Sequence, residues 1–221
     1  MYKIAAVIGD YYHREDMIQS ALMSAVQETF GGKTAVDVWI TDALELPQTL
    51  AKRPDLVVLF KENRVDPEGD KSALWMNEAI AQSITAYVKQ GGGWLAWHSG
   101  LASYPEDGAY VDMLRGSFAS HPELHELVEY EGNGVQFTIK DEHYFVHCDE
   151  SRTEVYLRST SVDGSSIAAW RHYYGEGRVC ALAPAHRPEG LQHPSFIGLL
   201  GEALAWCSGT EEHANSKEVK G

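Results

Sequence analysis

The fold prediction starts from residues 91–100, Gly91-Gly92-Gly93-Trp94-Leu95-Ala96-Trp97-His98-Ser99-Gly100. Three glycines end a helical pattern, and the four apolar residues that follow predict a short buried strand. The strand runs directly into His98, which has Ala96 two positions before it and Gly100 two positions after it. Small residues at those positions permit the sharp turn of a nucleophile elbow, which presents a reactive side chain at a sheet edge. Ser99 has the large residues Trp97 and Leu101 at the corresponding positions, so His98 is the predicted elbow residue.

Short apolar runs alternate with helical patterns through the first half of the chain. Strands are predicted at residues 4–8, 36–40, 56–60 and 94–97, and amphipathic helices at 18–30 and 76–88. Strands that alternate with helices pair in parallel through right-handed crossovers. The first half therefore predicts an α/β fold with a parallel sheet.

The second half changes character after about residue 120. Turn signals such as Asn133-Gly134 and Asp163-Gly164 separate β-rich runs near residues 126–131, 135–139, 154–160, 166–173 and 178–184. We expect hairpins that extend the same sheet antiparallel, and then a final helix that ends near Cys207. The prediction is one domain over residues 1–207 and a polar, flexible tail over residues 208–221.

Composition limits the kinds of partner. The chain has 221 residues and a formal net charge of −14, which argues against nucleic acid or an anionic membrane as a partner. Apolar runs fall short of the roughly 20 residues that span a bilayer, and of the roughly 7–15 of a secretory signal. Three cysteines without CxxC spacing are typical of a reducing compartment, so we expect a cytoplasmic protein.

Several strand ends carry residues with chemistry. Ligands of open parallel sheets bind beyond the carboxyl ends of the strands. The residues at those positions are Asp10, Tyr11, Tyr12, His13, Glu62, His98, Ser99 and His186. We therefore predict that His13, His98 and His186 face one cleft, with His98 on an exposed loop.

Four further segments strengthen the pattern around the elbow: Phe118-Ala119-Ser120-His121-Pro122, Tyr174-Gly175-Glu176-Gly177-Arg178-Val179, Ala185-His186-Arg187-Pro188-Glu189 and His193-Pro194. Together with residues 91–100 they resemble the ThuA-like (trehalose utilization) family over roughly residues 2–207. The resemblance implies a class I glutamine amidotransferase-like fold: a flavodoxin-like three-layer α/β sandwich, mainly parallel, with antiparallel hairpin additions in the C-terminal half. It also implies a role in the catabolism of disaccharides, in some cases through 3-keto sugars.

Two positions depart from the amidotransferases of that superfamily. Their elbow carries a nucleophilic cysteine where this chain has His98. Their distal histidine is followed two residues later by a glutamate, where this chain has Pro188 after His186. A thiolate is required to form the glutamyl thioester. We therefore expect no glutamine amidotransferase activity.

Two chemistries fit the remaining groups. In the first, His98, His186 and Ser99 are catalytic, and a neutral imidazole removes a proton next to a ketone or activates water. In the second, His13, His98 and His186 hold a divalent metal such as Zn²⁺ with a position open for water or a sugar oxygen. The sequence leaves both open.

Carbohydrate binding is predicted from polar and aromatic residues near the strand ends. Asp10 and Glu62 can accept hydroxyl hydrogen bonds, Tyr11 and Tyr12 can stack on a sugar ring, and His121 and His193 are secondary candidates. Trp97 and Tyr104 offer further rings. Asp10 and Glu62 could be a glycosidase pair only at a suitable separation. The histidines of the hairpin region are expected at structural or surface positions: His125, His143, His147 and His172.

Two functions follow as hypotheses. The first is an enzyme that acts on a disaccharide or keto-sugar by hydrolysis, lyase chemistry or isomerization. The second is a non-catalytic sugar-binding or regulatory module. The expected partner is a small-molecule carbohydrate, and fold analogy suggests a homodimer.

Overall fold

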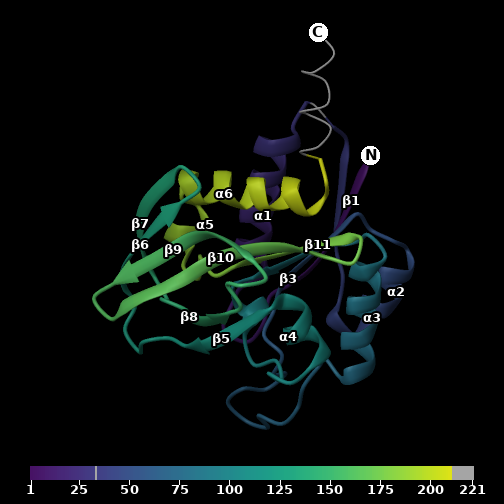
Figure 1. Ribbon diagram of the computed structural model, residues 1–221, viewed down its shortest axis with the longest axis horizontal. Coiled ribbons are helices and arrows are strands. Elements are labelled where there is room, and N and C mark those ends of the chain that lie inside the picture. The colour runs from purple at the N-terminus through teal and green to yellow at the C-terminus, as the bar shows by residue number, and fades with distance from the viewer. Residues whose placement is uncertain (33, 211–221) are drawn as a thin grey trace.

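Nine strands form one mixed sheet in the order β2-β1-β3-β4-β11-β10-β9-β6-β7 (Figure 1). The structure is a computed structural model that describes residues 1–32 and 34–210. The strands of this sheet are β1 (Tyr2–Ile8), β2 (Val36–Ile40), β3 (Leu56–Phe60), β4 (Gly93–Trp97), β6 (Glu126–Gly132), β7 (Val135–Asp141), β9 (Glu154–Ser161), β10 (Gly164–Tyr174) and β11 (Gly177–Leu182). The helices are α1 (Glu15–Phe30), α2 (Leu46–Ala51), α3 (Glu78–Lys89), α4 (Ala109–Leu114), α5 (Pro188–Leu191) and α6 (Pro194–Cys207), with 3₁₀ turns η1 (Ala43–Glu45) and η2 (His98–Leu101).

The parallel half of the sheet agrees with the predicted strands. β1 pairs in parallel with β2 and β3, β3 with β4, and β4 with β11. Every residue of β3 and β4 is buried, as expected for strands that are covered on both faces. The carboxyl ends of these strands therefore meet at one edge of the sheet.

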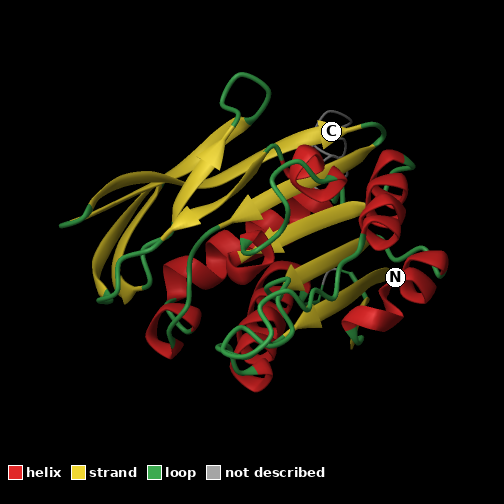
Figure 2. Cartoon of the chain, turned by 90° about the horizontal axis from the view of Figure 1, so that it is seen from below, coloured by secondary structure: helices red, strands yellow, loops and turns green. Residues whose placement is uncertain are grey.

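Helices cover both faces of the parallel half (Figures 1 and 2). Side chains alternate along a strand between the two faces of a sheet. Ile4, Ala6 and Ile8 of β1 accordingly pack in one core with α1 and α6, whereas Ala5 and Val7 pack in the other core with α2, α3 and α4. The result is a helix–sheet–helix sandwich.

Strands β10, β9, β6 and β7, which we call the antiparallel arm, extend the sheet beyond β11. The β6–β7 hairpin turns at Asn133 and Gly134, whose φ angles of 49° and 76° are those favoured by an Asn-Gly hairpin turn. The predicted hairpins and their place in the same sheet are confirmed. The sequence analysis missed a separate two-stranded sheet of β5 (Gly116–Ser120) and β8 (Phe145–Cys148).

The C-terminal helix α6 ends at Cys207, where the predicted tail begins. Ser208 and Thr210 still hydrogen-bond to carbonyl groups of the last turn of α6. The remainder of the predicted tail, residues 211–221, lies outside the described residues. In the described part of the chain, no helix is both long and apolar enough to cross a membrane.

Candidate functional site: a histidine–carboxylate cluster

The elbow after β4 has the strained geometry that the sequence predicts. His98 has a φ of 47°, in the left-handed region that few non-glycine residues occupy. A Cβ atom at Gly100 would lie 2.2 Å from the carbonyl oxygen of Leu59, so the chain after the elbow lies tightly against β3. The expectation of an exposed loop is wrong, because His98 is 0% exposed. Its ring stacks on Tyr144 at a centroid distance of 4.1 Å.

Gly100→Ala should therefore destabilise the protein. A methyl group cannot fit against backbone atoms that have no freedom to move, and overpacking of this kind costs about 1–3 kcal/mol. Urea unfolding should show this loss. Gly198→Ala in α6 is the matched control, because the nearest atom to its Cβ would lie 3.9 Å away and alanine gains up to about 1 kcal/mol over glycine in a helix. Equal stability of the two variants would contradict the tight packing at the elbow.

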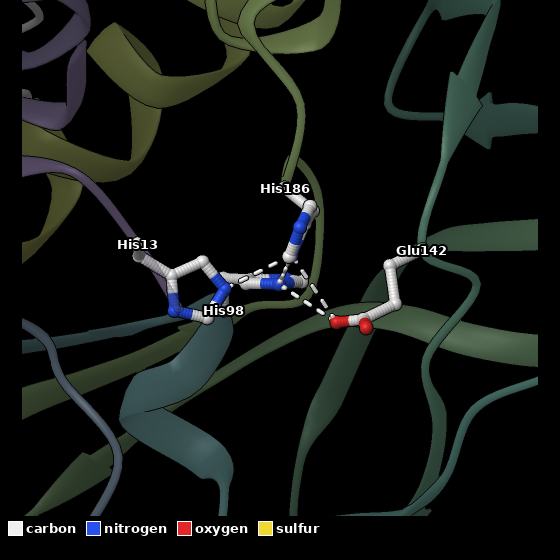
Figure 3. Close-up of side chains that lie close together, drawn as sticks. All are labelled: His13, His98, Glu142 and His186. Carbon is white, nitrogen blue, oxygen red and sulfur yellow. Dashed lines mark hydrogen bonds and ion pairs between the residues drawn. The ribbon is translucent and has the colours of Figure 1, made fainter. Parts of the chain in front are cut away.

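Four side chains converge beside the elbow (Figure 3). We call His13, His98, Glu142 and His186 the histidine–carboxylate cluster. One potential ligand atom from each lies within 4.8 Å of all the others. His13 follows β1, His98 follows β4, His186 follows β11 and Glu142 follows β7. The predicted convergence of the three histidines is thus what the structure has.

The distances within the cluster are short. His186 Nδ1 lies 2.9 Å from His13 Nε2 and 3.3 Å from both His98 Nε2 and Glu142 Oε2. His98 Nε2 lies 3.4 Å from Glu142 Oε2. Two ligands that are about 2.1 Å from one metal ion, at angles between octahedral and tetrahedral, lie about 3.0–3.4 Å apart. These four distances are close to the spacing of a metal-ligand set, and the remaining pairs of ligand atoms lie within 4.8 Å of each other.

Hydrogen-bond partners outside the cluster fix two of the imidazole tautomers. His13 Nδ1 lies 2.5 Å from Asp10 Oδ1, and His98 Nδ1 lies 2.6 Å from the carbonyl oxygen of Ala183. Both partners only accept hydrogen bonds, so each Nδ1 carries a proton and donates it. The Nε2 atoms of neutral His13 and His98 therefore present lone pairs to the cluster.

The cluster has too few protons for its acceptors. The lone pairs of His13 Nε2, His98 Nε2 and Glu142 Oε2 all face His186 Nδ1, which can donate at most one hydrogen bond. At least two acceptors would remain unsatisfied among groups that are largely withdrawn from water, which is costly. A divalent cation at the centre would satisfy all four atoms. The donor set, three imidazoles and one carboxylate, fits zinc and related first-row metals.

The charge states also suit a cation. Burial, together with the nearby His13 and His186, lowers the pKa of His98 to about 4, so the ring is neutral at pH 7. Burial alone would raise the pKa of Glu142, but the neighbouring His186 and His98 hold it well below its usual value. The cluster therefore combines a neutral imidazole at His98 with an ionised carboxylate at Glu142, the protonation states that metal ligands require.

Asp10 lies outside the cluster and orients His13 by a hydrogen bond. Its Oδ1 accepts from Tyr12 N, His13 N and His13 Nδ1, and its Oδ2 accepts from Glu62 N and Ser99 Oγ. Burial would raise the pKa of Asp10, yet these hydrogen bonds, led by that of His13, hold it at about 2. Both oxygens are thus occupied by protein donors. Asp10 is poorly placed to be half of a glycosidase pair with Glu62, and it orients His13 instead.

A cavity of about 400 Å³ opens onto the cluster. Its lining includes the predicted residues Tyr12, His13, Glu62, Ser99, His121 and His186, together with Arg64, Ala102, Ser103, Phe118, His125, Glu142 and Tyr144. The volume is at the small end of the range of about 300–1,000 Å³ for small-molecule pockets.

Other predicted residues lie elsewhere. Tyr11 is 61% exposed and does not line this cavity. His193 stacks on Phe137 at a centroid distance of 5.3 Å, outside the cavity lining. Trp97 and Tyr104 are core residues whose polar atoms donate to backbone carbonyl groups. The aromatic walls of the cavity come from Tyr12, Phe118 and Tyr144 instead.

Of the lining residues that were not predicted as site residues, Glu142, Tyr144 and His125 lie closest to the histidine–carboxylate cluster. Glu142 and Tyr144 follow β7 of the antiparallel arm, and no strand-end rule for parallel sheets covers them. His125, which was expected at a structural or surface position, lines the cavity with its Nε2 3.6 Å from Glu142 Oε1. The dense run Asp141-Glu142-His143-Tyr144, with no turn glycine, was the available signal. His143 and His172 do make structural hydrogen bonds, to Ser159 and Ser161 and to the Met113 carbonyl oxygen.

Fold and site together define an α/β protein with a potential metal centre at the carboxyl edge of its sheet. The chain belongs to the ThuA family, described as trehalose utilisation, because the family model matches residues 6–207. Comparison with curated proteins gives no match.

Solved structures share the fold at low sequence identity. A ThuA-like protein from Parabacteroides merdae is 16% identical with a TM-score of 0.71, over 94% of this chain and 90% of that one. A β-galactosidase from Rahnella sp. R3 is 16% identical with a TM-score of 0.62, over 93% of this chain but 31% of the enzyme. A cytoplasmic protein from Salmonella typhimurium is 13% identical with a TM-score of 0.62, over 92% of this chain and 98% of that one.

Proposed function

We propose that this protein is a metal-dependent enzyme of sugar catabolism that acts on a disaccharide or keto-sugar by hydrolysis or lyase chemistry. The observation that carries the proposal is the convergence of His13 Nε2, His98 Nε2 and Glu142 Oε2 on His186 Nδ1, at distances of 2.9, 3.3 and 3.3 Å. Membership of the trehalose utilisation family supports a sugar as the substrate.

The residues divide the work as follows. His13, His98, Glu142 and His186 hold the ion, which supplies Lewis acidity toward a ketone oxygen or water. Ser99, whose hydroxyl donates to Asp10 and lines the cavity, lies beside the bound sugar. The rings of Tyr12 and Tyr144 offer apolar faces to the C–H groups of the sugar. His121 and His125 at Glu142 Oε1 keep that carboxylate in position.

The finer fold assignment is part of the proposal. The parallel strand order β2-β1-β3-β4-β11 supports a flavodoxin-like, class I amidotransferase-like fold with residues 1–207 as one domain. Glutaminase activity is not proposed, because Cys148, Cys180 and Cys207 are absent from the described lining of the cavity. Unpaired cysteines support a cytoplasmic location, with a small carbohydrate as partner and a homodimer as assembly.

Metal analysis tests the proposal directly. The protein, purified without chelators, should contain or take up one Zn²⁺, Co²⁺ or Mn²⁺ per chain by plasma mass spectrometry. An ion at 100 times its Kd should add about 2.7 kcal/mol to the free energy of unfolding. NMR of the loaded protein with trehalose, other disaccharides and their 3-keto derivatives should then reveal turnover. Sugar binding without metal or turnover would favour a non-catalytic sugar-binding or regulatory module instead.

Asp10→Asn should weaken metal binding while the fold survives. An amide at this position no longer enforces the tautomer that leaves the lone pair on His13 Nε2. Loss of an outer partner of a metal-bound histidine typically lowers affinity about 10- to 100-fold, which competition with a chromophoric chelator can measure. Asp16→Asn is the control, since Asp16 lies exposed in the first turn of α1. Unchanged affinity in Asp10→Asn would argue against His13 as a ligand.

A further inference from the structure

One carboxylate oxygen of Glu62, in the lining of the cavity, is a buried acceptor without a hydrogen-bond partner among the described residues. Glu62 follows β3 at the carboxyl edge of the sheet and is 2% exposed. Its Oε2 accepts from Arg64 Nε at 2.8 Å, Arg64 Nη2 at 2.7 Å and Ser103 Oγ at 3.0 Å. Its Oε1 is buried and has no hydrogen-bond partner among the described residues. One oxygen is therefore anchored by protein donors, and the other has a vacant acceptor position.

Glu62 Oε1 can accept a hydrogen bond from a group that enters the cavity. A carboxylate paired with a guanidinium is ionised and can only accept hydrogen bonds. A buried acceptor without a partner is rare in native proteins, and it costs about 1–3 kcal/mol or more if charged. Glu62 lines the same cavity as the histidine–carboxylate cluster, so a ligand that enters the cavity can supply the missing donor.

We propose that Glu62 Oε1 recognises a hydroxyl group and thereby selects neutral, unphosphorylated sugars. This inference rests on the proposed function: one sugar oxygen faces the metal centre while a hydroxyl donates to Glu62. A phosphate or carboxylate at that hydroxyl position offers no proton at pH 7 and repels the ionised Glu62. Arg64 also lines the cavity, but its Nε and Nη2 both face Glu62 Oε2, so this edge of the guanidinium is not available to an incoming anion.

The test measures sugar binding by the metal-loaded protein. Isothermal titration should show that trehalose or 3-ketotrehalose binds the wild type more tightly than trehalose 6-phosphate. Glu62→Gln preserves the shape but loses the charge. It should weaken binding of the neutral sugars roughly 10- to 100-fold, the range of a charge-assisted hydrogen bond. Glu62→Gln should also narrow the difference in affinity between trehalose and trehalose 6-phosphate.

Two controls separate this inference from the metal proposal. Glu62→Gln should keep full metal content, because Glu62 is outside the cluster. Glu78→Gln, an exposed change in the first turn of α3, should leave sugar binding unchanged. Equal binding of the neutral sugars by Glu62→Gln and wild type would overturn the inference. So would tighter binding of trehalose 6-phosphate, or no binding of any neutral sugar by fully loaded protein. A failure to load metal would instead overturn the proposed function.

Discussion

His98→Ala should lower the free energy of unfolding of the metal-free protein by about 2–4 kcal/mol. The ring is fully buried and stacks on Tyr144, so its loss leaves a cavity in the core. The Ala183 carbonyl oxygen also loses the hydrogen bond from His98 Nδ1, which lies 2.6 Å away. The change also removes the His98 Nε2 acceptor from a cluster that has too few donors, and this offsets part of the cost.

Urea unfolding in the presence of a chelator measures this effect without any contribution from metal binding. His121→Ala is the matched control, because that side chain is 41% exposed, and exposed substitutions usually change stability by less than about 0.5 kcal/mol. Equal stability of His98→Ala and His121→Ala would show that the elbow ring is not part of the core.

Glu142→Gln should have opposite effects on the metal-free and metal-loaded protein. An amide is a weak ligand, and loss of a direct ligand should exceed the roughly 10- to 100-fold affinity loss that outer partners cause. In the metal-free protein, however, the amide NH₂ can donate to the lone pair of His98 Nε2 or to His186. Because it relieves the shortage of donors, the metal-free variant should be at least as stable as the wild type.

Calorimetric metal titration and chelator-treated thermal unfolding give the two readouts. Glu126→Gln, an exposed change on β6, should alter neither. A variant that loses stability without metal would indicate that Glu142 serves as a hydrogen-bond acceptor for protonated histidines. A variant that keeps metal affinity would remove Glu142 from the ligand set.

The sequence was most informative about the parallel half of the molecule. Short apolar runs that end in Asp10, Glu62, His98 and His186 imply one sheet edge, because parallel strands all end on the same side. Local spacing at Ala96 and Gly100 likewise anticipated the tight elbow. These inferences needed only local patterns and the rule that strands alternating with helices pair in parallel.

Local patterns could not predict which residues the antiparallel arm brings to the site. The position of Glu142 depends on how β6 pairs with β7 on one side and with β9 on the other, and the pairing with β9 is a matter of long-range register rather than of local pattern. His125 enters the cavity for the same reason. The burial of His98 was also missed, since it arises from Tyr144 of the same distant segment, which covers the elbow ring.

The four cluster residues lie far apart in the chain, and His13 and His186 are separated by 173 positions. An ion bound among them would cross-link the chain and close three long loops, between residues 13 and 98, 98 and 142, and 142 and 186. The segments around residues 13, 98, 142 and 186 would then open together rather than independently. Amide hydrogen exchange at all four should slow in concert when the ion binds, so that one small ligand couples the arm to the parallel sheet.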